Sequence, residues 1–308
     1  MNKCPITYKA IKEGKYSLEG LRLLSKNLQE LHDFPYTAQE QVIIAETMAS
    51  KLSIQGIQPK LCVNLDTKAN VFKIVKSYGH FIVKPPHQLF KELPQNEDLS
   101  MKLAKACGLE VPLHGMFYNT DQTLSYFIQR FDRASKKTKY SLEDFSQLLG
   151  YHRDTKYNAS IEQAKNVIQK YCTFPSVEKL KFFRLMIFNY LIGNEDMHLK
   201  NFSLLTVNQV TKLSPVYDLI NTTIVMKTTE ELALPLNGKK SKLKKTDFLD
   251  YLGKNQLDLK NQDIEEIIHS FKEIIPAWIN LINISFLSPE QKIKYQELLE
   301  QRRDKLLF

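Results

Sequence analysis

The segment GNEDMHLKN, residues 193–201, brings together side chains that can transfer a phosphoryl group. Asp196, His198 and Asn201 stand in D-x-H-x-x-N spacing, and Asp218 follows after an apolar segment and the residues SPVY. In phosphoryl transfer from a metal-bound nucleotide, one carboxylate accepts the proton of the attacking hydroxyl, while an amide and a second carboxylate hold Mg²⁺ against the phosphates. We therefore interpret Asp196 as the catalytic base, and Asn201 with Asp218 as the Mg²⁺ ligands.

Three neighbours of these residues have candidate roles as well. Lys200 is placed to clamp a phosphate, and His198 to orient the loop. Tyr217 precedes the metal carboxylate, where it either stacks near the nucleotide or fills the core. The competing interpretation is that the polar residues of this loop only cap helices and satisfy buried backbone groups. The second carboxylate, returning after an expected β-hairpin over 201–218, favours the chemical interpretation.

A nucleotide kinase also needs a loop over the phosphates, and the segment SIQGIQPK, residues 53–60, is the candidate. Gly56 lets the backbone approach a phosphate closely, and Ser53 and Gln58 add side-chain donors. Lys60 closes the segment with a positive charge. A single glycine makes neither a Walker A loop nor a G-x-G-x-x-G loop, so an ordinary turn is the alternative.

A lysine in FIVKPP is the candidate for neutralising the phosphates. Lys84 interrupts a run of strand residues near the strand end. It is either an edge-strand lysine, which is common, or a lysine that binds the α- and β-phosphates and pairs with a carboxylate on the next helix. Glu97 is the expected partner of Lys84 in that second interpretation.

The segment QRFD, residues 129–132, ends the last strand of the first half. A two-lobed kinase has its hinge at this point, where the backbone of Gln129–Phe131 would hydrogen-bond adenine. Asp132 either reaches the ribose or forms an ordinary ion pair with Arg130 that closes the strand.

These residues need a scaffold of strands followed by helices. Alternation and Val/Ile content predict strands within 58–66 and 71–86 and two more within 116–132. A helix is expected from an N-cap at Asn96 to Gly108, and a buried central helix from Ser176 to Gly193. The fold class is therefore α+β, with a smaller β-rich N-lobe over 1–132, a larger helical C-lobe over 133–308, and C-terminal helices near 262–284 and 289–305.

Composition describes an ordinary globular protein of 308 residues, 43% apolar and 25% charged. We find no secretory signal and no apolar run long enough for a bilayer, and the four cysteines are scattered. A cytoplasmic protein with free thiols and no membrane contact is expected. The net charge of +9 lies largely in runs 133–139 and 238–245, which are either solvated loops or attract an acidic partner.

In this order, the motifs resemble those of the HipA-like serine/threonine kinases of bacterial toxin–antitoxin systems. The marks are S-I-Q-G-I-Q-P-K, I-V-K-P-P, R-F-D-R, E-D-F-S-Q, D-M-H-L-K-N-F-S and S-P-V-Y-D, and they cover most of the chain from Ser53 onward. The resemblance implies a bilobal kinase-like fold related to phosphoinositide kinases. It also implies ATP and Mg²⁺ as cofactors, Ser53 as an autophosphorylated serine, and Gln147 near the nucleotide.

The short length resembles HipT, the kinase of three-part systems in which a separate small protein supplies a missing N-terminal piece. HipT-type loops carry two serines in S-I-S, whereas Gln55 replaces the second here. Other short members begin with paired cysteines, and this chain has only Cys4, which leaves a thiol or metal role there in doubt.

The same resemblance implies small HipS-like and HipB-like antitoxins as partners, with DNA contacted only through the antitoxin. The implied substrate is an aminoacyl-tRNA synthetase, with or without bound tRNA. The rival hypothesis is a catalytically inactive kinase-fold binding module that regulates a protein or DNA partner. A lipid or small-molecule kinase is a third interpretation, although no basic amphipathic helix favours a lipid surface.

Overall fold

The computed structural model describes residues 2–49, 58–133, 135, 138–151, 157–226 and 229–308. The chain divides into two compact units. Unit 1 comprises Met1–Leu99, Pro112–Lys139 and Ile284–Leu287. Unit 2 comprises Ser100–Val111, Tyr140–Asn283 and Ser288–Phe308.

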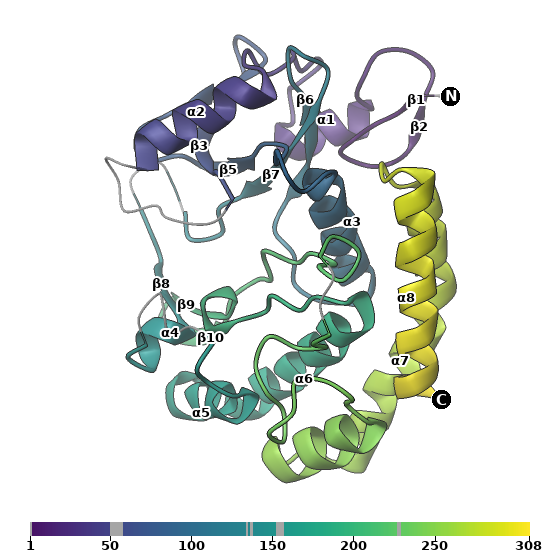
Figure 1. The fold of residues 1–308 in the computed structure, drawn as a ribbon. Coiled ribbons are helices and arrows are strands. Elements are labelled where there is room, and N and C mark those ends of the chain that lie inside the picture. The colour runs from purple at the N-terminus through teal and green to yellow at the C-terminus, as the bar shows by residue number, and fades with distance from the viewer. Residues whose placement is uncertain (1, 50–57, 134, 136–137, 152–156, 227–228) are drawn as a thin grey trace. The chain divides into compact units, whose positions relative to one another are not determined.

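Unit 1 is built on a five-stranded sheet that is antiparallel throughout (Figure 1). In spatial order its strands are β4 (Val71–Ile74), β3 (Leu61–Asp66), β5 (Phe81–Lys84), β7 (Leu124–Gln129) and β6 (His114–Tyr118). Phenylalanines of four of these strands form the centre of its core, with rings 5.1–6.0 Å apart: Phe72, Phe81, Phe117 and Phe127. The predicted β-rich first half is therefore present.

Short elements complete unit 1. They are the paired strands β1 (Asn2–Lys3) and β2 (Ala10–Ile11), and the helices α1 (Leu18–Leu24) and α2 (Ala38–Ala49). Ser17 caps α1 by accepting a hydrogen bond from the amide of Gly20 at 3.1 Å, as an N-cap serine does. Helix α3 (Leu93–Ala106) begins in unit 1 and ends in unit 2.

Two boundaries in unit 1 differ from the sequence prediction. The segment 71–86 holds two strands, β4 and β5, which run in the same direction and pair with opposite sides of β3. The link between them contains Tyr78, whose φ is 57°. Helix α3 starts at Leu93, and the amide of Asn96 already donates to the carbonyl of Glu92 at 2.9 Å. Asn96 is therefore inside the helix and the N-cap prediction was wrong, which places Glu97 in the second turn.

Unit 2 is organised around the buried helix α6 (Pro175–Ile192), which packs against α5 (Ile161–Tyr171), α8 (Pro289–Leu307) and the π-helix η3 (Asp247–Gln256). Its remaining helices are α4 (Phe145–Leu148), the 3-10 turn η2 (Leu199–Asn201) and α7 (Asn261–Ile284). The start of α6 was misplaced, since Phe174 is the N-cap and Pro175 opens the helix where Ser176 was expected. The end at Gly193 is as predicted.

A three-stranded antiparallel sheet lies in unit 2, in the order β10 (Val210–Leu213), β9 (Ser203–Val207), β8 (Ser141–Asp144). The β9–β10 hairpin confirms the predicted one. Asn208 and Gln209 form its two-residue turn with φ values of 49° and 66°, the left-handed pair that a type I′ turn requires. Strand β8 was not predicted.

Among the described residues, no helix has the length and apolar character needed to span a membrane. All four cysteines carry free thiols, and Cys4 is fully buried. In the second basic run, Lys239 is ion-paired with Asp247 at 3.0 Å.

Candidate active site

The loop after α6 begins at Gly193, whose backbone sets its direction. Gly193 has a φ of 70°, in the left-handed region that favours glycine, and a Cβ there would clash with Leu298 and Thr223. Its carbonyl oxygen accepts a hydrogen bond from the amide of Thr222 at 3.0 Å. The backbone at Gly193 therefore fixes the direction in which residues 194–201 leave helix α6.

Asp196 lies in this loop with its main chain fixed on both sides. Its amide donates to Asn194 Oδ1 at 3.2 Å, and its carbonyl accepts from the amide of His198 at 2.8 Å and from Asn201 Nδ2 at 3.0 Å. All three partners are buried, whereas Asp196 is half-buried. The structure therefore brings Asp196, His198 and Asn201 together as the motif requires. Their chemical roles stay predictions.

The hairpin returns the chain to the same end of unit 2, where Tyr217 ties the two segments together. Its hydroxyl donates to the carbonyl oxygen of Lys200 at 2.8 Å and lies 2.5 Å from Ser203 Oγ. Burial raises the pKa of Tyr217, so the hydroxyl keeps its proton and stays a donor. Tyr217, which precedes Asp218, is thereby bonded to Lys200, which precedes Asn201. Neither sequence interpretation of this tyrosine included that role.

Asp218 has a backbone conformation that is uncommon for a residue with a side chain. Its φ is 54°, in the left-handed region that aspartate tolerates better than most residues. Strained backbones of this kind concentrate at functional sites. Tyr78, Asn208 and Gln209 share the left-handed conformation outside the site, so it does not by itself mark Asp218 as functional.

The oxygen atoms of Asn201 and Asp218 suit Mg²⁺, a cation that prefers oxygen ligands. The Asn201 amide uses Nδ2 for the carbonyl of Asp196, which leaves Oδ1 as the atom for a cation. In the described part of the chain, no group of three or more His, Cys, Asp or Glu side chains could hold a metal by itself. Two protein oxygens, with phosphate and water completing the shell, is the arrangement that Mg²⁺ usually takes.

In unit 1, Lys84 and Glu97 form the ion pair that the sequence suggested. Lys84 Nζ lies 2.6 Å from Glu97 Oε1, and the two residues are 2% and 0% exposed. Lys84 leaves the end of β5, and Glu97 comes from α3. An edge-strand lysine is thereby excluded, because β5 lies inside the sheet between β3 and β7. A buried charge pair of this kind is expensive to build and indicates a specific role.

The end of β7 shows an Arg–Asp pair at the predicted hinge. Asp132 is buried and accepts two hydrogen bonds from Arg130, at 3.0 and 2.8 Å. Burial acts to raise the pKa of Asp132, but the hydrogen bonds and charges of Arg130 outweigh it, and the pKa lies below its usual range. This is the second of the two interpretations of Asp132. The backbone amides of Gln129 and Arg130 bond to carbonyls of their own unit.

The structure describes only some of the other residues that were predicted to contact the nucleotide. Gln147 forms a capping box with Asp144 at the start of α4, so its side chain is already engaged in helix capping. Gln58 and Lys60 are half-buried before β3. Ser53 and Gly56 lie outside the described residues.

Sequence reasoning missed the polar network behind the loop. Glu195 accepts hydrogen bonds from Thr223 Oγ1 at 2.9 Å and from Arg302 Nη2 at 3.3 Å. Arg302 is a buried residue of α8 whose guanidinium lies 4.5 Å from the ring centre of Tyr190. Asn189, which interrupts the apolar run of α6, also accepts from Asn194 Nδ2 at 2.8 Å. That interruption was the one signal in the sequence.

Within this network, the contribution of Glu195 to the free energy of unfolding depends on pH. Burial, aided by the charges of nearby glutamates, raises the pKa of Glu195 from 4.5 to about 6 despite Arg302 and Thr223. A carboxyl whose pKa is higher in the folded state stabilises the fold at low pH. That stabilisation is lost as the pH rises from about 4.5 to about 6. We expect Glu195→Gln to melt at an increasingly higher temperature relative to the wild type across this window.

The measurement is thermal unfolding of both proteins between pH 4 and 8, followed as the difference of their midpoints. The exposed Glu265→Gln is the matched control and should show a flat difference. A flat difference for Glu195→Gln as well would contradict the assigned shift.

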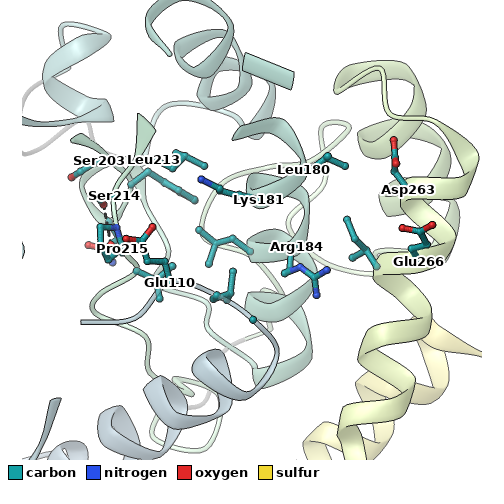
Figure 2. Close-up of a pocket in the computed structure, with 17 residues that line it drawn as sticks. Glu110, Leu180, Lys181, Arg184, Ser203, Leu213, Ser214, Pro215, Asp263 and Glu266 are labelled. Atoms are coloured by element: carbon teal, nitrogen blue, oxygen red, sulfur yellow. Dashed lines mark hydrogen bonds between the residues drawn. The ribbon is translucent and has the colours of Figure 1, made fainter. Parts of the chain in front are cut away.

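A cavity of about 290 Å³ in unit 2 lies beside the hairpin (Figure 2). It is lined by α6 residues, including Lys181 and Arg184, by Ser214 and Pro215 after β10, and by the first turns of α7. Asn201 belongs to its wall, but neither Asp196 nor Asp218 does. The cavity therefore does not by itself form the predicted carboxylate site.

Comparison with known proteins gives a consistent family. The model of the HipA-like C-terminal domain matches residues 52–279. A candidate kinase from Haemophilus influenzae is 29% identical over 82% of this chain and 80% of that protein. The serine/threonine-protein kinase toxin HipA of Shewanella oneidensis is 25% identical, over 61% of this chain and 47% of that protein.

Solved structures share the fold. HipA of Shewanella oneidensis, solved with HipB and operator DNA, superposes with a TM-score of 0.69 at 21% identity, covering 91% of this chain and 73% of that chain. The proinflammatory kinase CtkA of Helicobacter pylori gives a TM-score of 0.53 at 18% identity, covering 77% and 88%. The expected α+β, kinase-like fold is confirmed.

Proposed function

Because the chain belongs to the family of HipA-like C-terminal domains, we propose that it is an ATP- and Mg²⁺-dependent serine/threonine protein kinase that acts as the toxin of a toxin–antitoxin system. The observation that carries the proposal is the buried Lys84–Glu97 pair at 2.6 Å. A fixed lysine beside a helix carboxylate is what a kinase needs to hold the α- and β-phosphates of ATP.

The residues divide the chemistry as follows. Lys84 binds the nucleotide phosphates. Asn201 and Asp218 would hold Mg²⁺, which would neutralise charge on the phosphates. Asp196 accepts the proton of the acceptor hydroxyl as that oxygen bonds to the γ-phosphorus and ADP leaves. Lys200 clamps the transferred phosphate, and His198 keeps the Asp196 loop in place.

The proposal extends to partners and substrate. The Shewanella relative was solved with HipB and operator DNA, and we propose HipB-like and HipS-like antitoxins for this chain, with DNA contacted only through them. The proposed substrate is an aminoacyl-tRNA synthetase, modified on a serine, in the cytoplasm. A HipT-like kinase is part of the same proposal.

The direct test is autophosphorylation. Purified protein incubated with Mg²⁺ and ATP should gain one phosphate, located at Ser53 by peptide mass spectrometry. Ser53→Ala should remain unmodified, and chelation of Mg²⁺ should prevent the gain in the wild type. Full turnover with phosphate only at other sites would refute the role of Ser53. The absence of any phosphoryl transfer, to the chain itself or to synthetases in a lysate, would refute the kinase.

A further inference from the structure

Tyr157 reaches the proposed catalytic base from a different part of unit 2. It lies shortly before α5, whose start is fixed by the capping box of Ser160 and Gln163. Its phenol hydroxyl donates a hydrogen bond to Asp196 Oδ1. Its ring stands edge-on to His198, with ring centres 5.1 Å apart and an angle of 84° between the planes. Tyr157 thus contacts two of the three residues of the D-x-H-x-x-N motif.

The hydrogen bond from Tyr157 to Asp196 resembles the one that a substrate hydroxyl must make before phosphoryl transfer. A general base takes the proton of an attacking hydroxyl through a hydrogen bond from that hydroxyl to its carboxylate. The Tyr157 hydroxyl makes such a bond to Asp196. Burial raises the pKa of Tyr157, and the hydrogen bond and charge of Asp196 raise it further, so the phenol remains protonated and keeps donating at neutral pH.

Tyr157 is not required to hold the loop. The main chain of Asp196 is already fixed by Asn194, His198 and Asn201, all of which are buried. Tyr157, in contrast, is 37% exposed. The ring of Tyr157 can therefore move away from Asp196 without opening the core. Breaking the three buried contacts, in contrast, would open the core.

We propose that Tyr157 is an internal acceptor mimic, whose hydroxyl occupies on Asp196 the position that the hydroxyl of a protein substrate must take. The inference rests on the proposed function, since it requires Asp196 to be the base. In this state the Tyr157 hydroxyl competes with the substrate hydroxyl for the Asp196 carboxylate. Docking of a substrate serine, or of a water molecule, requires the tyrosine to move aside.

The test is Tyr157→Phe, which removes the hydroxyl and keeps the ring. With MgATP, we expect ATP hydrolysis and transfer to dephosphorylated casein to rise about tenfold, the effect of losing one hydrogen bond to a charged group. KM for ATP should not change. Tyr151→Phe is the matched control, because the Tyr151 hydroxyl accepts a hydrogen bond from Gln163 Nε2 at 3.2 Å instead of contacting Asp196.

The outcomes separate this inference from the proposed function. Turnover that depends on Asp196 but is unchanged or slower in Tyr157→Phe would overturn the acceptor mimic and leave the kinase intact. A slower variant would mean that Tyr157 supports the base. No turnover in either protein would refute the kinase itself.

A readout without turnover comes from thermal unfolding of Tyr157→Phe, Asp196→Ala and the double variant. If the two side chains interact as the structure shows, the shifts of the single variants are not additive, and the double variant differs little from one of them. Additive shifts would show that the contact is absent in solution and would overturn the inference whatever the activity.

Discussion

Asp196→Asn is expected to slow phosphoryl transfer from ATP by about 10²–10⁴-fold, the usual contribution of a general base. The substituted amide has the shape of the carboxylate but cannot accept the proton of the attacking hydroxyl. The loop should keep its structure, because the contacts with Asn194, His198 and Asn201 use the main-chain amide and carbonyl of residue 196, whereas Tyr157 contacts its side chain. Steady-state release of ADP, with nucleotide affinity and melting temperature measured beside it, checks this expectation.

Asp258→Asn is the matched control for that substitution. Asp258 is an exposed aspartate of unit 2, and its turnover should equal that of the wild type. Wild-type turnover in Asp196→Asn would show that another group takes the proton. A wild-type protein that binds MgATP without turnover would favour the inactive binding module instead.

The residues of the site could be predicted where chemistry and local pattern coincide. D-x-H-x-x-N spacing fixes three side chains within one loop, and the β9–β10 hairpin follows from apolar segments on either side of a two-residue turn. Lys84 was recognisable because a charge inside an apolar strand needs a partner. Its partner Glu97 lies on the next helix, at short range along the chain.

The remaining features depend on contacts that no local pattern encodes. The Glu195–Arg302 pair joins residues 107 positions apart. Tyr157 lies 39 positions from Asp196 and has no motif of its own. Strand β8 has the polar sequence SLED and a half-exposed pattern, so it forms only because β9 offers a pairing edge. The left-handed backbone of Asp218 likewise has no signal in the sequence.

Lys84→Met tests the second half of the proposed machinery, in unit 1. The substitution leaves the fully buried Glu97 carboxylate without its cation, which typically costs about 3–5 kcal/mol of folding free energy. We expect a large drop of the melting temperature together with loss of ATP binding. Lys73→Met is the matched control on the same sheet. Lys73 pairs with Asp66 at 2.6 Å but is exposed, so its replacement should leave the midpoint nearly unchanged.

The double variant Lys84→Met/Glu97→Leu separates stability from chemistry. Replacing a buried ion pair by apolar residues of similar volume is often neutral or stabilising, because neither charge then has to be desolvated. The melting temperature should therefore recover, whereas ATP binding and turnover should stay lost. Recovery of turnover with stability would show that the pair only supports the fold. Recovery of stability alone would mean that the buried pair is needed for binding the phosphates through Lys84, and not for the stability of the fold.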